Sequence, residues 1–167
     1  MTPAELLTDA LGRTAGGAVS LLDGLTEDDL ARRPAPNANS IAWLVWHLTR
    51  IQDDHVADVA GSQQVWTEQG YADRFGLPFP DGDTGFGHTP DQVAQVQAPA
   101  GLLLDYLRAV HARSVEYLAA LKAVDLDRIV DERWDPPVTL GVRLVSVVDD
   151  CAQHLGQASY VKGLLGT

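Results

Sequence analysis

The sequence predicts an all-α protein, a bundle of four long helices connected by long crossover loops. Apolar residues recur at helical spacing in four long segments, and most of these segments begin at a capping residue. The stretches between them contain the Gly and Pro residues that end helices. We find no internal repeat and no composition shift that would mark a linker. At 167 residues, the chain is therefore expected to form one domain over residues 1–167.

Capping residues place the helices of the first half. Thr2, Pro3 and Glu5 have the spacing of a helix start, and the apolar pattern then continues to Asp23. Thr26 is the expected cap of a short helix that ends before Pro34. Ser40 is the expected cap of a long helix over residues 41–60, which Gly61 would end.

The crossover between residues 61 and 89 is long and rich in Gly, Pro and Asp. It also contains all three phenylalanines of the chain, a tryptophan and a tyrosine. So many aromatic residues argue against disorder. We therefore expect an ordered segment with one or two helical turns, which either covers a functional site as a lid or pads the outside of the bundle.

The second half repeats the pattern of long helices and irregular connections. A short helix is expected at Thr89-Pro90-Asp91, and a long one from Pro99 to about Lys122. Residues 124–132 are expected to add one helical turn. Residues 133–138 form a non-helical connection with a possible pair of short strands, and the last long helix runs over residues 142–165.

Composition narrows the possible partners and the location of the protein. The 12 basic and 23 acidic residues give a net charge of −11, which repels nucleic acid and anionic membrane surfaces. Cys151 is the only cysteine, and neither a signal peptide nor a membrane-spanning run is recognisable. We therefore expect a cytoplasmic protein that acts on a small molecule, without nucleic acid or membrane partners.

Three residues have the side chains and spacing of a metal site. Asp150 and His154 are four residues apart, so a helix places them on one face. His47 lies at the edge of the apolar face of the second long helix, one turn after Trp43. Two imidazoles and a carboxylate suit zinc, nickel, iron or manganese, and they leave room for water or a substrate.

Each of these residues also has a simpler interpretation. A histidine beside an apolar face is often a hydrogen-bonded core residue, and an Asp–His pair four apart can be a surface ion pair. Cys151 is interpreted as a small buried side chain rather than a nucleophile. Asp53 and Asp54 are expected to face solvent or to pair with arginines, although Asp54 lies near the face of His47. The other histidines are interpreted as surface or core residues; they are His55, His88 and His111.

Two short motifs resemble the DinB-like superfamily. They are Trp43-Leu44-Val45-Trp46-His47-Leu48 and, about a hundred residues later, His154-Leu155-Gly156-Gln157. The resemblance is closest to the branch that includes DUF664 proteins and the metal-binding domain of mycothiol-dependent maleylpyruvate isomerase. It covers essentially the whole chain.

The resemblance implies a four-helix bundle that holds one divalent metal through three residues. For this chain, zinc or nickel is the expected metal. The ligands fall on His47, Asp150 and His154, with Gln157 and Trp43 as supporting neighbours. Many relatives have His at the position of Asp150, and the isomerase type has Glu, so this chain carries a shorter carboxylate. Homodimers occur among such proteins, which makes a homodimer possible here.

The characterised relatives are transferases or isomerases that use a thiol as cosubstrate. The resemblance therefore implies a metal-dependent thiol S-transferase that acts on small electrophiles. Ten of the twelve basic residues are arginine, a composition that favours mycothiol as the thiol. The alternatives are a metal-hydroxide hydrolase, an iron oxygenase, and a metal-binding or stress-related bundle without catalysis.

Overall fold

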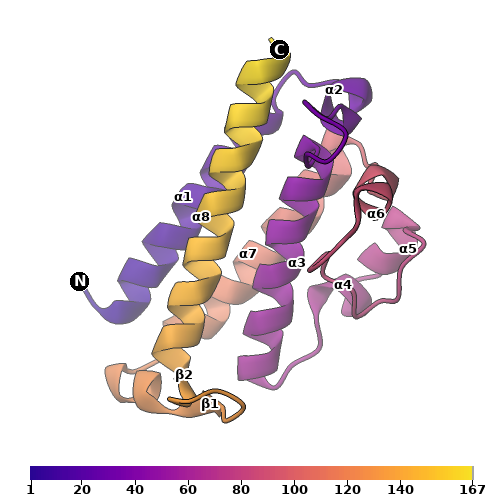
Figure 1. The fold of residues 1–167 in the computed structure, drawn as a ribbon. Coiled ribbons are helices and arrows are strands. Elements are labelled where there is room, and N and C mark those ends of the chain that lie inside the picture. The colour runs from indigo at the N-terminus through magenta and orange to yellow at the C-terminus, as the bar shows by residue number, and fades with distance from the viewer. Residues whose placement is uncertain (167) are drawn as a thin grey trace.

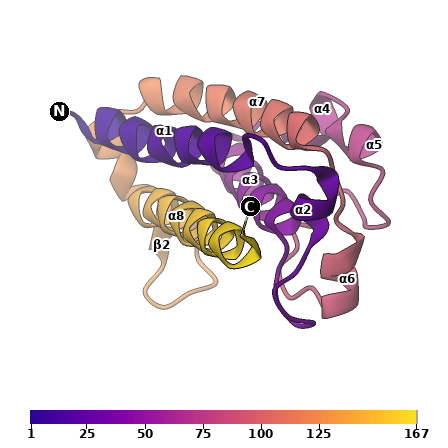
Figure 2. The same cartoon turned by 90° about the horizontal axis from the view of Figure 1, so that it is seen from above.

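Four long helices form the body of the protein in the computed structural model, which describes residues 1–166 (Figure 1). They are α1 (Pro3–Leu22), α3 (Ile41–Ala60), α7 (Ala100–Ala119) and α8 (Leu140–Leu165). Each long helix packs against two others, so that α1, α7, α3 and α8 follow one another around the bundle (Figure 2). The predicted all-α four-helix bundle is confirmed.

The short elements lie in the connections between the long helices. The helices α4, α5 and α6 gather beside α3 and α7, away from α1 (Figure 1). A two-stranded antiparallel sheet and a short 3₁₀ helix lie at the end of the bundle where α8 begins. The bounds of the short elements are α2 (Glu27–Ala31), α4 (Val65–Glu68), α5 (Tyr71–Phe75), α6 (Pro90–Gln95), η1 (Ala123–Asp127), β1 (Ile129–Asp131) and β2 (Val138–Thr139).

Side-chain caps set most of the helix starts. The hydroxyl of Thr2 accepts the backbone N–H of Glu5, and that of Ser40 accepts the N–H of Trp43. At the far end of α3, Gly61 adopts φ 65°, a left-handed conformation that glycine tolerates without strain. The start and end of α3, which carries His47, are therefore fixed by local sequence.

Three predicted helix ends were wrong by a few residues. The last helix begins at Leu140 rather than residue 142, because the hydroxyl of Thr139 caps it by accepting the N–H of Val142. The helix expected to reach Lys122 ends at Ala119, and the chain then continues into η1. The short second helix likewise ends at Ala31, before the expected residue 33.

The core divides into two buried clusters of apolar side chains. One cluster is aromatic and joins α3 and α7 to the crossover; it includes Trp43, Trp46, Trp66, Phe75 and Tyr106. The other is aliphatic and fills the centre of the bundle; it includes Leu11, Leu48, Leu107, Leu118 and Leu144. The crossover is therefore an ordered part of the core, as its aromatic residues predicted.

Candidate metal centre

His47, Asp150 and His154 meet between α3 and α8, which pack side by side. One ligand atom from each lies within 4.8 Å of those of the others. The two imidazole rings are 4.7 Å apart between centroids and almost perpendicular. The packing of the two helices thus brings together three residues that lie up to 107 positions apart in the sequence, which their helical spacing alone could not establish.

His47 is buried, and a backbone carbonyl fixes its orientation. Its Nδ1 lies 2.5 Å from the carbonyl oxygen of Thr84. Because a carbonyl can only accept, Nδ1 must carry a proton in this contact. The Nε2 atom of the neutral ring then keeps its lone pair, the form in which histidine binds metals. Burial lowers the pKa of His47, which further favours this neutral form.

His154 is held between Gln157 and Asp150. Its Nδ1 lies 3.0 Å from Oε1 of Gln157, one turn further along α8, and its Nε2 lies 3.5 Å from Oδ1 of Asp150. The hydrogen bond that the protonated ring of His154 donates to the carboxylate of Asp150 raises the pKa of His154. The carboxylate of Asp150 therefore favours a positive charge on the ring of His154.

The carboxylate of Asp150 indicates most clearly whether a cation fits between the three side chains. Its Oδ2 is buried and has no hydrogen-bond partner among the described residues. An unpartnered carboxylate oxygen inside a protein is costly. Two histidines with available Nε2 atoms lie beside it, so the group offers a divalent ion two nitrogens and a carboxylate. The donor set fits such an ion.

Trp43 contacts both histidines. Its ring stacks on His47 at 4.5 Å between centroids, with 12° between the planes, and it meets the edge of His154 at 6.2 Å. The structure therefore places Trp43 against both candidate histidine ligands and Gln157 against His154. One face of His47 is thereby shielded from water.

Part of the crossover covers the buried side of the centre. Residues 81–88, here called the 81–88 loop, lie against the rings of His47, Trp43 and Trp46. Gly85 has φ 90°, and a Cβ added there would lie 2.8 Å from Trp46 Cζ3 and 3.0 Å from His47 Nδ1. Only glycine allows this close approach. The 81–88 loop therefore packs against His47 itself and does more than pad the outside of the bundle; its role as a lid stays a prediction.

His88 belongs to this cover rather than to the ligand group. Its Nδ1 accepts the indole N–H of Trp43 at 3.1 Å, and its Nε2 lies 3.1 Å from the carboxylate of Asp83. The side chain is only 3% exposed. Of the two interpretations of His88, surface residue or core residue, the structure therefore supports the core residue.

The remaining candidates lie outside the three-residue group. Asp53 is buried and lies 3.6 Å from Arg50, so the predicted arginine pairing holds and the solvent-facing alternative is wrong. Asp54 accepts from the side-chain amide of Gln64 instead of reaching the centre. Cys151 is fully buried, and burial raises the pKa of its thiol, which agrees with its interpretation as a packing residue.

The fold and the residues that it brings together define a class of protein. A four-helix bundle with histidine on the second long helix and an Asp–His pair on the last is a DinB-like bundle, and the predicted superfamily is confirmed. Within it, the mycothiol S-transferase family model matches residues 6–166. The chain therefore belongs to the mycothiol S-transferase family.

A solved structure supports the fold over its whole length. The chain is 36% identical to a conserved protein from Enterococcus faecalis, whose crystal structure superposes with a TM-score of 0.94. The match covers 100% of this chain and 99% of that one. No curated protein matches the chain significantly. Among residues 1–166, no helix has both the length and the apolar character needed to cross a membrane.

Proposed function

We propose that the protein is a divalent-metal-dependent thiol S-transferase that conjugates a mycothiol-type thiol to small electrophilic molecules. The ligands are His47, Asp150 and His154, and the ion is zinc or nickel. The observation that carries the proposal is the buried, unpartnered Oδ2 of Asp150 beside two histidines. Membership of the mycothiol S-transferase family supports the choice of reaction.

The ion would supply one kind of chemistry. A bound divalent cation lowers the pKa of a coordinated thiol, so that the thiolate is available at neutral pH. In the transfer, the thiol sulfur would form the new bond to the electrophilic carbon, the leaving group would depart with the electron pair of the broken bond, and the thiol proton would pass to solvent. The conjugate and the displaced group account for all atoms and electrons.

The surrounding residues hold the ligands and control access. Thr84 and Gln157 each occupy the Nδ1 side of one histidine, which leaves the two Nε2 atoms free to bind an ion, and Nε2 of His154 lies 3.5 Å from Oδ1 of Asp150. The side chains of Asp150 and His154 are 30% and 18% exposed, whereas His47 is buried. Substrates would therefore approach from the side of α8, opposite the 81–88 loop.

A neighbouring pocket suits the apolar part of a small substrate. It has a volume of about 230 Å³ and shares Gln157 with the candidate centre. Its walls are almost entirely apolar and are formed by Pro34, Ala38, Leu44, Tyr160, Val161 and Leu164, with Asn39 at the edge. We infer that the electrophile carries an apolar group.

Association as a homodimer stays a prediction.

Metal content and thiol transfer test the proposal together. Untagged wild-type protein should bind about one Zn²⁺ or Ni²⁺ per chain and should conjugate mycothiol to a model electrophile such as monochlorobimane. His154→Ala should lose both properties, because it removes a ligand. His111→Ala, which changes a histidine on α7, is the matched control and should retain both. Thiol transfer that persists in metal-free wild-type protein would refute the proposal.

A further inference from the structure

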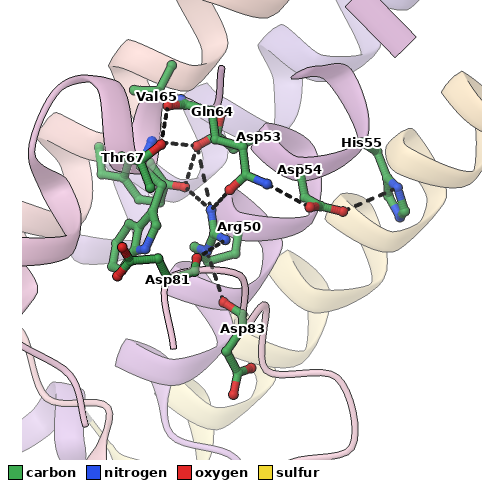
Figure 3. A network of polar contacts seen from close by, with 11 residues as sticks. Arg50, Asp53, Asp54, His55, Gln64, Val65, Thr67, Asp81 and Asp83 are labelled. Carbon is green, nitrogen blue, oxygen red and sulfur yellow. Dashed lines mark hydrogen bonds and ion pairs between the residues drawn. The ribbon is translucent and has the colours of Figure 1, made fainter. Parts of the chain in front are cut away.

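Arg50 forms an unusual polar centre inside the bundle (Figure 3). It lies on α3, one turn after His47, and its side chain is fully buried. Its Nε donates to the carbonyl of Asp83 at 3.2 Å, and its Nη2 donates to the carbonyl of Asp81 at 3.0 Å. Its Nη1 donates to Gln64 Oε1 and to the hydroxyl of Tyr106. The guanidinium thus binds the 81–88 loop at two points.

The countercharge of Arg50 holds the other end of the crossover. Asp53, one turn further along α3, lies 3.6 Å from the guanidinium. Its carboxylate accepts the backbone N–H groups of Val65 and Trp66 at the start of α4, as well as the hydroxyl of Tyr106. The buried pair on α3 therefore anchors both the beginning and the end of the crossover (Figure 3).

The bonds from Arg50 lead directly to His47. The carbonyl of Asp83, which Arg50 binds, belongs to the peptide unit just before Thr84. The carbonyl of Thr84 is the group that meets Nδ1 of His47. The carboxylate of Asp83 also accepts the N–H of Gly85 at 2.7 Å, which fixes the next turn of the chain.

We propose that Arg50 is a positioning residue, which by binding the carbonyls of Asp81 and Asp83 holds the Thr84 carbonyl against His47 and so keeps the His47 proton on Nδ1. The consequence for metal affinity rests on the proposed function, because it assumes that Nε2 of His47 binds the ion. The effect on the tautomer of His47 does not depend on that assumption.

The geometry of the guanidinium makes arginine the suitable residue. Its N–H groups point in fixed, divergent directions, so that one buried cation bonds to two loop carbonyls while also facing Gln64, Tyr106 and Asp53. A lysine at this position would keep the charge opposite Asp53, but its one ammonium has three N–H groups at a single point and cannot reproduce the four hydrogen bonds that Arg50 makes from three nitrogens. Arg50→Lys therefore separates the positioning role from the charge.

The tautomer of His47 can be measured in metal-free protein. In two-bond ¹H–¹⁵N correlation spectra at about pH 8, the wild-type His47 signal, assigned with His47→Gln, should show protonated Nδ1 and unprotonated Nε2. Arg50→Lys and Arg50→Met should both give a mixture of tautomers. Zn²⁺ affinity should fall by roughly tenfold or more, as for other groups that orient metal ligands.

Two further variants complete the test. Arg74→Met is the matched control, because Arg74 lies in the same crossover, pairs with Asp105 and stacks on Tyr71, yet makes none of these loop contacts. It should leave the His47 signal unchanged. Gly85→Ala should displace the loop while keeping Arg50, because the new Cβ would lie 2.8 Å from Trp46 Cζ3. It should also mix the tautomers.

Every outcome decides the proposal. If Arg50→Met does not fold, the His47 tautomer in Arg50→Lys decides whether Arg50 is a positioning residue. If neither variant folds, the His47 tautomer in Gly85→Ala decides it. A folded Arg50→Lys protein in which His47 keeps its proton on Nδ1 overturns the positioning role, and so does an unchanged signal in Gly85→Ala when it is the deciding variant. Wild-type protein that binds no metal would refute the proposed function alone, because the tautomer is read without metal.

Discussion

Asp150 carries the only formal negative charge in the three-residue group, and its position is costly without a cation. Its Oδ1 faces His154 at 3.5 Å, and its Oδ2 is buried without a partner. The neighbouring Asp149 is exposed and is bound to Gln153 instead. Two adjacent aspartates on α8 thus differ in whether their charge faces the candidate centre.

Asp150→Asn should weaken metal binding much more than Asp149→Asn. Asparagine preserves the shape of the side chain but removes the charge that attracts the ion. We expect the affinity for Zn²⁺ to fall by more than the roughly 10–100-fold typical of losing a supporting partner of a ligand. Competition with a chromophoric chelator measures this affinity. Equal affinities of the two variants would show that Asp150 is not a ligand.

At the scale of single residues, the sequence could predict the candidate ligands but not what holds them. Asp150 and His154 share a helical face because of their spacing, and His47 follows from a short motif. The partner of His47 is a backbone carbonyl, which leaves no trace in the identity of Thr84. The buried pairing of Arg50 with the loop depends on the folded path of a long crossover, so no local pattern reveals it.

Asp131 on β1 ties the hairpin of β1 and β2 to the first turns of α8. Asp131 accepts hydrogen bonds from Arg133 beside it and from Arg143 on α8, at 2.8 and 2.9 Å. Its side chain is 4% exposed. The hydrogen bonds from Arg133 are the main reason why the pKa of Asp131 lies far below its usual range. The first turns of α8 therefore depend on a carboxylate in the preceding strand.

Asp131→Asn should destabilise the protein in a pH-dependent way. A carboxyl whose pKa is lower in the folded state stabilises that state above its unfolded pKa of about 3.9 and loses this contribution as the pH falls. The variant should thus be less stable than wild type at pH 7, and the difference should shrink below about pH 4. Urea denaturation at several pH values measures the free energy of unfolding.

Asp9→Asn is the control for this prediction, because Asp9 pairs with Arg13 on the exposed face of α1. Exposed pairs of this kind contribute little to stability. A stability difference between Asp131→Asn and wild type that stays constant from pH 7 to pH 3 would contradict the linkage to the carboxyl pKa.

At the scale of elements, caps predicted more than apolar periodicity did. Ser40 and Gly61 delimit α3 as expected, because both act through bonds to residues within four positions. The start of α8 was missed because its cap, Thr139, is also the last residue of β2, and the apolar pattern alone gave no reason to begin the helix there. The order of the long helices around the bundle depends on contacts between segments that are distant in the sequence, and no local pattern reveals those contacts.

The whole molecule combines a net charge of −11 with one candidate three-residue site for a cation among residues 1–166. Its acidic field attracts divalent ions to many surface carboxylates, which hold them weakly. A specific site differs because its ligands come from α3 and α8. The ion would therefore connect two helices that are separated by 79 residues of the chain, residues 61–139. Such a site exists only in the folded state and should stabilise it.

Zn²⁺ should therefore raise the melting temperature of the wild-type protein in a saturable way. At a free concentration of 100 times Kd, binding adds about 2.7 kcal/mol to the free energy of unfolding. For a chain of this size, that corresponds to a rise of roughly 5–10 °C. Differential scanning calorimetry with buffered Zn²⁺ measures the change, and EDTA should reverse it.

His154→Ala separates the specific site from weak surface binding, because it leaves nearly all of the acidic surface intact. The melting temperature of this variant should respond to Zn²⁺ only weakly and without saturation, whereas His111→Ala should respond like wild type. If all three proteins gain the same stability, the ions act through the surface charge of the molecule. In that case, the convergence of His47, Asp150 and His154 would serve only to pack α3 against α8.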